Sequence, residues 1–189
     1  MRGTLSKVVR LATSRRYSVL RVEAGRRVDF WKVKAKADNL LEVGANSMLA
    51  SRVVFEKAGA RHKIGARSFI GLGLMSIAAQ VDIGDDVLVS WGSTIVDHHS
   101  HSLRTRERIS DVEQWIKGHK DWTGVRILPV RIENRAWLGF NVSLLPGVVI
   151  GEGAIIGAGS VVTQSVPAWT IAAGNPARVL RELNADERA

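Results

Sequence analysis

The sequence predicts an all-β solenoid built from short strands. Aliphatic residues recur every six positions in the C-terminal half, a period that fits neither one long strand nor a helix. A small or β-branched residue follows each of them four positions later. The aliphatic set is Ile132, Leu138, Leu144, Ile150, Ile156 and Val162, and the second set is Ala136, Val142, Val148, Ala154, Ser160 and Val166. Each repeat therefore directs two side chains toward a common core.

Residues 1–36 form a basic arm. They hold 11 of the 27 Lys and Arg but 2 of the 18 Asp and Glu, which leaves 16 of each sign elsewhere, so the net charge of +9 comes from the arm. Leu5, Val8, Val9 and Ala12 have helical spacing and predict a short amphipathic helix. Such a helix can cap the solenoid or make peripheral contact with an anionic membrane. Without a recognition motif, the basic residues do not favour nucleic-acid binding.

Residues 37–183 are predicted to form the solenoid domain, and residues 184–189 a tail. An earlier block repeats the period of six at Ile77, Ile83, Val89 and Ile95. The register slips by one residue between Ile70 and Ile77, and the pattern is ragged before that point. We therefore expect the first coils to be irregular or to act as a cap.

A long excursion, residues 97–129, interrupts the repeats and opens with the run DHHSH. Long excursions in compact domains are usually functional or disordered. Histidine titrates near neutral pH and can serve as a general base. Extrapolating the repeat from Ile95 directs His99 to the core and His98 outward. Asp97 could orient a histidine ring, or it could cap a turn.

The runs IGDDVL, IGEGAI and IGAGSV, with DHHSH and the GNPAR tail, resemble the hexapeptide-repeat acyltransferases, including maltose, galactoside and polysaccharide O-acetyltransferases. The resemblance extends from about Leu41 to Leu183. It implies a left-handed parallel β-helix with a short C-terminal helix, assembled as a homotrimer. Where the chain leaves the coil, it implies that His98 is the catalytic base, with His101 as the second candidate and Asp97 as a weaker one.

The resemblance also implies acetyl-CoA as the acyl donor. The residues carried over by motif as its binding site are Trp137, Gly139, Ala158, Thr163, Gln164, Arg178 and Arg181. Arginine can neutralise the phosphates of coenzyme A, although Arg178 and Arg181 could instead form the solvated face of a C-terminal helix. Gln164 stands where relatives commonly carry lysine, which removes one positive charge.

Several chemistries are disfavoured by the sequence. The chain has no cysteine, which excludes disulfides and thiolate sites and fits a reducing compartment, so we expect a cytoplasmic protein. The run DHHSH does not match the histidine spacing of hexapeptide-fold carbonic anhydrases, so no metal is expected. No apolar run reaches the length of a membrane-spanning helix. The absence of a G-x-S-x-G motif disfavours a covalent acyl-enzyme.

The function predicted from these features is transfer of acetyl from acetyl-CoA to a sugar hydroxyl, in a surface polysaccharide or its precursor, with histidine as general base. An antibiotic or other xenobiotic O-acetyltransferase would share the same features. A non-catalytic trimeric β-helix scaffold is the alternative outside enzymes, although DHHSH and the GNPAR tail argue against it.

Overall fold

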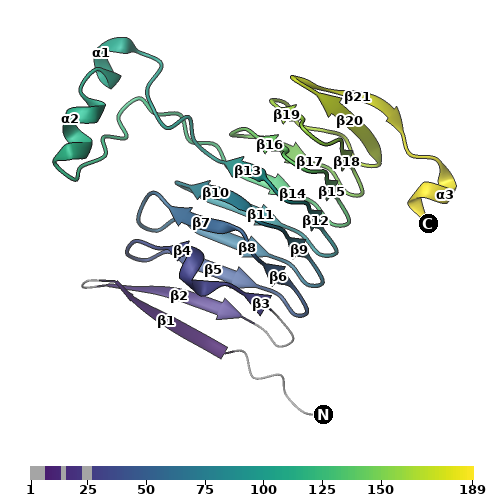
Figure 1. The fold of residues 1–189 in the computed structure, drawn as a ribbon, viewed down its shortest axis with the longest axis horizontal. Helices are drawn as coiled ribbons and strands as arrows, with labels where there is room; N and C mark the ends of the chain where they lie inside the picture. Colours follow the sequence, from purple (N-terminus) through teal and green to yellow (C-terminus); the bar gives the residue numbers. More distant parts are fainter. Residues whose placement is uncertain (1–6, 14–15, 23–26) are drawn as a thin grey trace.

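Three parallel sheets wind around one core (Figure 1). The structure, a computed structural model, describes residues 7–13, 16–22 and 27–189, with side chains from residue 27 onward. Successive strands enter sheets A, B and C in turn, and strands one coil apart pair in parallel. This arrangement confirms the solenoid that the period of six predicts.

The strands are short, and they fall into three sets. Sheet A contains β1 (Lys7–Thr13), β2 (Arg16–Val22), β5 (Leu40–Val43), β8 (Arg61–Ile64), β11 (Gln80–Ile83), β14 (Val130–Ile132) and β17 (Val149–Ile150). Sheet B contains β3 (Arg27–Val28), β6 (Met48–Leu49), β9 (Phe69–Ile70), β12 (Leu88–Val89), β15 (Trp137–Leu138), β18 (Ile155–Ile156), β20 (Thr170–Gly174) and β21 (Ala177–Glu182). Sheet C contains β4 (Val33–Lys34), β7 (Arg52–Phe55), β10 (Gly73–Ile77), β13 (Ser93–Val96), β16 (Ser143–Leu144) and β19 (Val161–Val162).

Helical segments are few and short. They are η1 (Phe30–Lys32), α1 (Thr105–Arg108), α2 (Asp111–Ile116) and α3 (Ala185–Arg188). Within the described residues, no helix has both the length and the apolar character needed to span a bilayer.

The core consists of the residues that the repeat predicts. The six aliphatic residues from Ile132 to Val162 are at most 1% exposed, and the intervening small set is at most 6% exposed. Burial of this column from coil to coil supplies the main favourable term for folding. The early coils are less regular, because β7 and β10 are longer than the two-residue strands β16 and β19.

The register slip lies at a different residue from the predicted one. Met75, five residues after Ile70, pairs with Val53 on one side and with Ile95 on the other. Met75 therefore occupies the repeat position that the sequence pattern gives to Ile77. Ile77 is a second inward residue of the longer strand β10, and both side chains are buried.

The N-terminal prediction of an amphipathic helix is wrong. Residues 7–13 and 16–22 form the antiparallel strands β1 and β2, and Leu5 lies outside the described residues. Strand β2 pairs in parallel with β5, so it belongs to the first coil of sheet A. Strands β3 and β4 likewise stack on β6 and β7. The stacked coils thus begin before residue 37, inside the segment whose charge suggests a separate arm.

The C-terminal segment is a hairpin followed by one helical turn. Strands β20 and β21 pair antiparallel at the end of sheet B. Arg178 and Arg181 therefore lie on a strand, not on the helix that the sequence suggests, and Asn175 and Pro176 lie in the hairpin turn. The short helix α3 follows and carries a capping box formed by Asn184 and Glu187.

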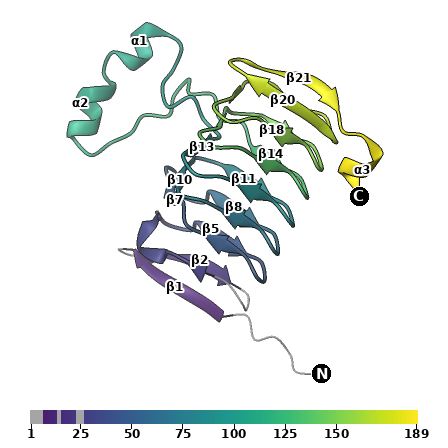
Figure 2. The ribbon, with the colours of Figure 1, turned by 45° about the vertical axis from the view of Figure 1, so that its right-hand side comes forward.

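The excursion leaves the solenoid at the corner between sheets C and A. Helices α1 and α2 stand away from the coils in both views (Figures 1 and 2). The two ends of the excursion meet again, because the Leu128 amide donates to the Asp97 carbonyl and His98 forms an antiparallel bridge with Ile127. Sheet A continues across the interruption, since β11 pairs directly with β14.

Candidate active site

Asp97 fixes the start of the excursion. Its side chain is fully buried, and its carboxylate accepts hydrogen bonds from the amides of Ala78, Ala79 and Gln80, each at 2.7 Å. These amides belong to the turn between β10 and β11 and to the first residue of β11, so Asp97 caps that turn. The sequence leaves two roles open for Asp97, to orient a histidine ring or to cap a turn. These hydrogen bonds support the role of turn cap.

His98 lies against the preceding coil and is 5% exposed. The Ser100 amide donates to Nδ1 at 3.1 Å, so the neutral ring carries its proton on Nε2. Nε2 lies 3.0 Å from Ser76 Oγ, and Ser76 Oγ lies 3.3 Å from Glu56 Oε1. A directed chain therefore leads from His98 through Ser76 to the Glu56 carboxylate.

The surroundings of His98 favour the neutral form of its ring. Burial lowers the pKa of His98 below its ordinary value of 6.5, and the carboxylates of Asp97 and Glu56 offset part of that effect. Lys120 and His99 act in the same direction as burial. The neutral form is the one that can accept a proton from a substrate hydroxyl.

The predicted orientations of the first two histidines are reversed. His98 is buried, whereas His99 is exposed. The extrapolation fails because the strand ends at Val96 and Asp97 turns inward to cap the neighbouring coil. His98 nevertheless borders a pocket.

His101 is held by a residue that the sequence analysis did not single out. Its Nδ1 forms a short contact with Asp111 Oδ2 at the start of α2. The His101 side chain is 40% exposed, and its ring packs against Trp115 at a centroid distance of 5.2 Å. Lys120 Nζ lies 3.8 Å from the same Asp111 oxygen and 4.8 Å from the Trp115 ring centroid.

A pocket of about 370 Å³ lies between the coils and the excursion. The lining residues come from the position after β7, from β10 and from the excursion: Glu56, Ser76, His98, Ser100, His101, Trp115, Gly118, His119, Lys120 and Trp122. Trp122 meets the His98 ring edge-on at 5.2 Å. Aromatic faces beside hydrogen-bonding side chains are suited to holding a sugar-sized polar molecule.

The residues carried over as the coenzyme A site lie elsewhere. An added Cβ at Gly139 would lie 2.8 Å from the backbone nitrogen of Ala158, so only glycine permits this approach of two coils. Trp137 precedes Gly139 and is 48% exposed. These three residues lie on sheet B and at its corner with sheet C.

The other residues predicted to bind coenzyme A are at other positions of the fold. Thr163 and Gln164 follow β19 at the corner between sheets C and A, and both are exposed. Arg178 is exposed on β21. Arg181 forms two hydrogen bonds of 2.6 Å with the Glu187 carboxylate. One chain therefore does not bring His98 and Gly139 to the same corner, because sheet C separates the two corners.

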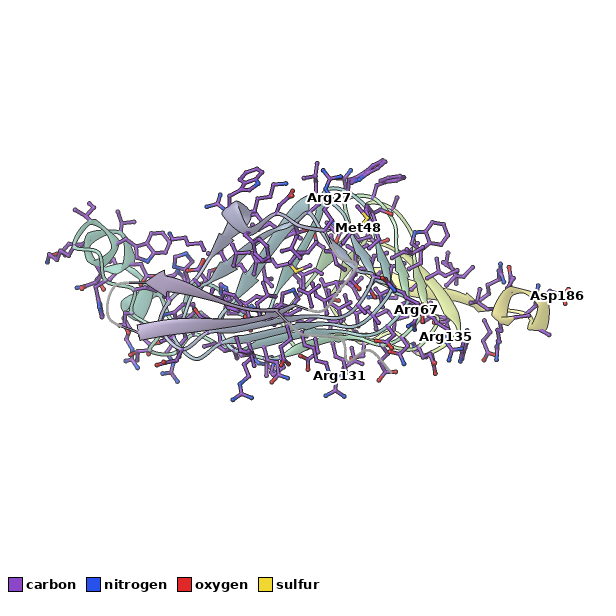
Figure 3. The ribbon with its side chains drawn as sticks, turned by 90° about the horizontal axis from the view of Figure 1, so that it is seen from below. Arg27, Met48, Arg67, Arg131, Arg135 and Asp186 are labelled. Carbon is purple, nitrogen blue, oxygen red and sulfur yellow. The ribbon has the colours of Figure 1, made fainter. Side chains whose placement is uncertain are left out.

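The outer face of sheet B is apolar from β6 to β20. The outward residues are neighbours in register: Met48, Phe69, Leu88, Trp137, Ile155 and Ile171. At the adjoining corner, Trp91 and Phe140 pack at 5.3 Å and are about half exposed. Figure 3 shows Met48 and Arg27 on this side of the molecule and Arg131 of sheet A on the other. Apolar faces of this extent commonly mark interaction sites.

A parallel solenoid with a histidine-lined pocket at an interrupted corner defines a class of protein, the hexapeptide-repeat transferases. The family model for the bacterial transferase hexapeptide (six repeats) matches residues 129–164. A hexapeptide-repeat acetyltransferase from Vibrio cholerae, solved in complex with acetyl coenzyme A, is 32% identical with a TM-score of 0.60, over 75% of this chain and 70% of that chain. The chain belongs to this family.

Two further relatives are informative. Galactoside O-acetyltransferase of Escherichia coli (strain K12) is 34% identical over 116 residues, which cover 58% of this chain and 57% of that protein. The chain thus matches little more than half the length of this curated relative. The structure of the polySia specific acetyltransferase NeuO superimposes with a TM-score of 0.71 at 26% identity, over 87% of this chain and 72% of that chain.

Proposed function

We propose that this protein transfers the acetyl group of acetyl-CoA to a hydroxyl of a saccharide, with His98 as general base. The observation that carries the proposal is the position of His98, a nearly buried imidazole on the pocket where the solenoid is interrupted. Family membership supports the donor, because a relative with 32% identity was solved with acetyl coenzyme A.

The chemistry requires His98 to accept the proton of the attacking hydroxyl. The acceptor oxygen would replace Ser76 Oγ as the partner of Nε2, and this exchange needs the ring proton on Nδ1. The Ser100 amide would then give up its hydrogen bond to Nδ1, and Ser100 Oγ, 3.4 Å from Nδ1, can accept a hydrogen bond from the Nδ1 proton in its place. The imidazolium formed during attack then protonates the departing thiolate. A positioned base of this kind contributes roughly 10²- to 10⁴-fold in rate.

The donor site is proposed to lie at a subunit interface. Trp137, Gly139 and Ala158 lie on a different corner from His98, so the base of one chain would meet the donor groove of a second copy. The apolar face of sheet B supports association, and a three-sided solenoid suits a closed homotrimer. Arg178 would neutralise a phosphate of coenzyme A. Acetyl-CoA is available in the cytoplasm, and we place the reaction there.

The acceptor is proposed to be a sugar of a polysaccharide or its precursor. Trp115 and Trp122 provide faces for a pyranose ring, and His101 and Lys120 provide polar contacts. The galactoside and polySia acetyltransferases among the similar proteins support a saccharide over an antibiotic acceptor. A non-catalytic scaffold would not need the chain of Ser100, His98, Ser76 and Glu56.

The test measures release of coenzyme A thiol with acetyl-CoA and a panel of mono- and oligosaccharides. We compare the unmodified protein with His98→Asn and with His99→Asn, a matched control whose side chain is exposed next to the pocket residue. The proposal expects His98→Asn to lose at least about 10²-fold in kcat while it still binds acetyl-CoA. Full activity of His98→Asn, or no transfer to any saccharide by the unmodified protein, contradicts the proposal.

A further inference from the structure

The excursion carries a second histidine whose ring is fixed by a carboxylate. A carboxylate can only accept hydrogen bonds, so the contact between His101 Nδ1 and Asp111 Oδ2 places a proton on Nδ1. In the neutral ring, Nε2 then keeps its lone pair. His98 has the opposite arrangement, because the Ser100 amide donates to its Nδ1. The same pocket therefore contains two histidines in opposite tautomers.

The pair of His101 and Asp111 is built into the pocket wall. Asp111 is a nearly buried carboxylate, with 8% of its side chain exposed. Lys120 lies 3.8 Å from the same carboxylate oxygen, and its own Nζ donates to the Ser100 carbonyl. Trp115 packs against the His101 ring from α2. The ring is therefore held on two sides, while 40% of the side chain stays exposed.

We propose that Asp111 is a positioning residue that presents His101 Nε2 as a hydrogen-bond acceptor to a second hydroxyl of the substrate. This inference rests on the proposed function and deepens it. One hydroxyl would approach His98 and react, and another hydroxyl of the same molecule would donate to His101. The favoured acceptor is thus a polyhydroxylated molecule such as a saccharide, in preference to an alcohol with a single hydroxyl.

The inference predicts a specific split of kinetic constants. In Asp111→Asn the amide can donate to Nδ1, which moves the ring proton to Nε2 and removes the acceptor. We expect about a tenfold higher KM for the saccharide in Asp111→Asn and in His101→Asn, with no further rise in the double variant. The KM for acetyl-CoA should stay unchanged. Asp111→Glu, which keeps a carboxylate, should restore part of the affinity.

Glu113→Gln is the matched control. Glu113 lies on the same helix, and its carboxylate pairs with Lys117 at an exposed position. Glu113→Gln should change neither the KM for the saccharide nor the KM for acetyl-CoA. A purely structural role of Asp111 would instead lower the melting temperature and affect both substrates alike, and that result overturns the inference.

Nitrogen-15 NMR of the histidine rings tests the inference without any turnover. The full-length protein should show His101 protonated at Nδ1, Asp111→Asn should show the proton at Nε2, and Glu113→Gln should match the unmodified protein. Addition of galactose or sialic acid oligomers should perturb the Nε2 signal. A proton on Nε2 of His101 in the unmodified protein refutes the inference, whereas a failed transfer assay beside the expected spectra contradicts only the proposed reaction.

Discussion

His62 should make the stability of this protein sensitive to mild acid. The residue occupies an inward position of sheet A, in register between Leu41 and Val81, and is 1% exposed. Nδ1 pairs with the Val81 carbonyl at 2.8 Å, whereas Nε2 has no hydrogen-bond partner within the described residues. Burial lowers the pKa of His62 from 6.5 to about 4. The folded state therefore disfavours the charged ring.

The magnitude follows from the difference between the two pKa values. Between pH 6.5 and pH 4 the unfolded chain binds the proton and the folded chain does not, so the free energy of unfolding falls as the pH falls. The difference corresponds to about 3 kcal/mol in full, and to about 2 kcal/mol at pH 5. Above pH 6.5 this contribution is constant.

The assay compares urea unfolding of the unmodified protein and His62→Leu at fixed protein concentration from pH 4.5 to pH 8. Leucine matches the aliphatic column and removes both the titration and the unpaired nitrogen. We expect the stability advantage of His62→Leu to grow by about 2 kcal/mol between pH 7.5 and pH 5. The exposed His99→Gln serves as the control. An advantage of His62→Leu that does not change with pH would refute this reasoning.

Four further predictions concern the site and the coils. Because the pKa of His98 is lowered, the acidic limb of the kcat/KM profile should lie below pH 6.5, and Glu56→Gln should move it lower still; a limb above pH 6.5 contradicts the assignment. Asp97→Asn should lower the free energy of unfolding in urea by about 3 kcal/mol, because three amides lose a charged acceptor. An unchanged free energy of unfolding excludes the capping role. Gly139→Ala should separate two coils and lower the melting temperature, and calorimetry should show weaker acetyl-CoA binding; an unchanged melting temperature would contradict the close approach of the two coils. Trp137→Ser should shift sedimentation toward smaller species, whereas Arg131→Ser on sheet A should not.

The solenoid could be predicted from the sequence because its core repeats with a fixed period. Ile132 to Val162 are buried as expected, since each coil imposes the same two inward positions. The N-terminal strands could not be predicted in this way. Val8, Val9 and Ala12 fit helical spacing, and nothing in that spacing indicates their pairing with β2. The position of Met75 likewise became apparent only through its partners Val53 and Ile95.

The candidate site was predicted only in part. His98 and His101 stand out in the sequence because they are close together and follow a strand. Ser76 and Glu56 do not stand out in the sequence, because they lie on earlier coils and no local motif marks them. Only the fold brings Ser76 to His98 and Glu56 to Ser76. Asp111 lies ten residues beyond His101, and only the fold of the excursion brings the two side chains together.

The way in which the excursion is joined to the coils has a consequence for evolution. Its first and last residues are held side by side by the bridge of His98 with Ile127 and the hydrogen bond from Leu128 to Asp97, while β11 and β14 pair as if the chain were continuous. The pairing of β11 with β14 therefore does not depend on the length of the segment between residues 97 and 129. On the proposed function, the acceptor pocket can therefore change with the excursion, while the corner bearing Gly139 stays as it is.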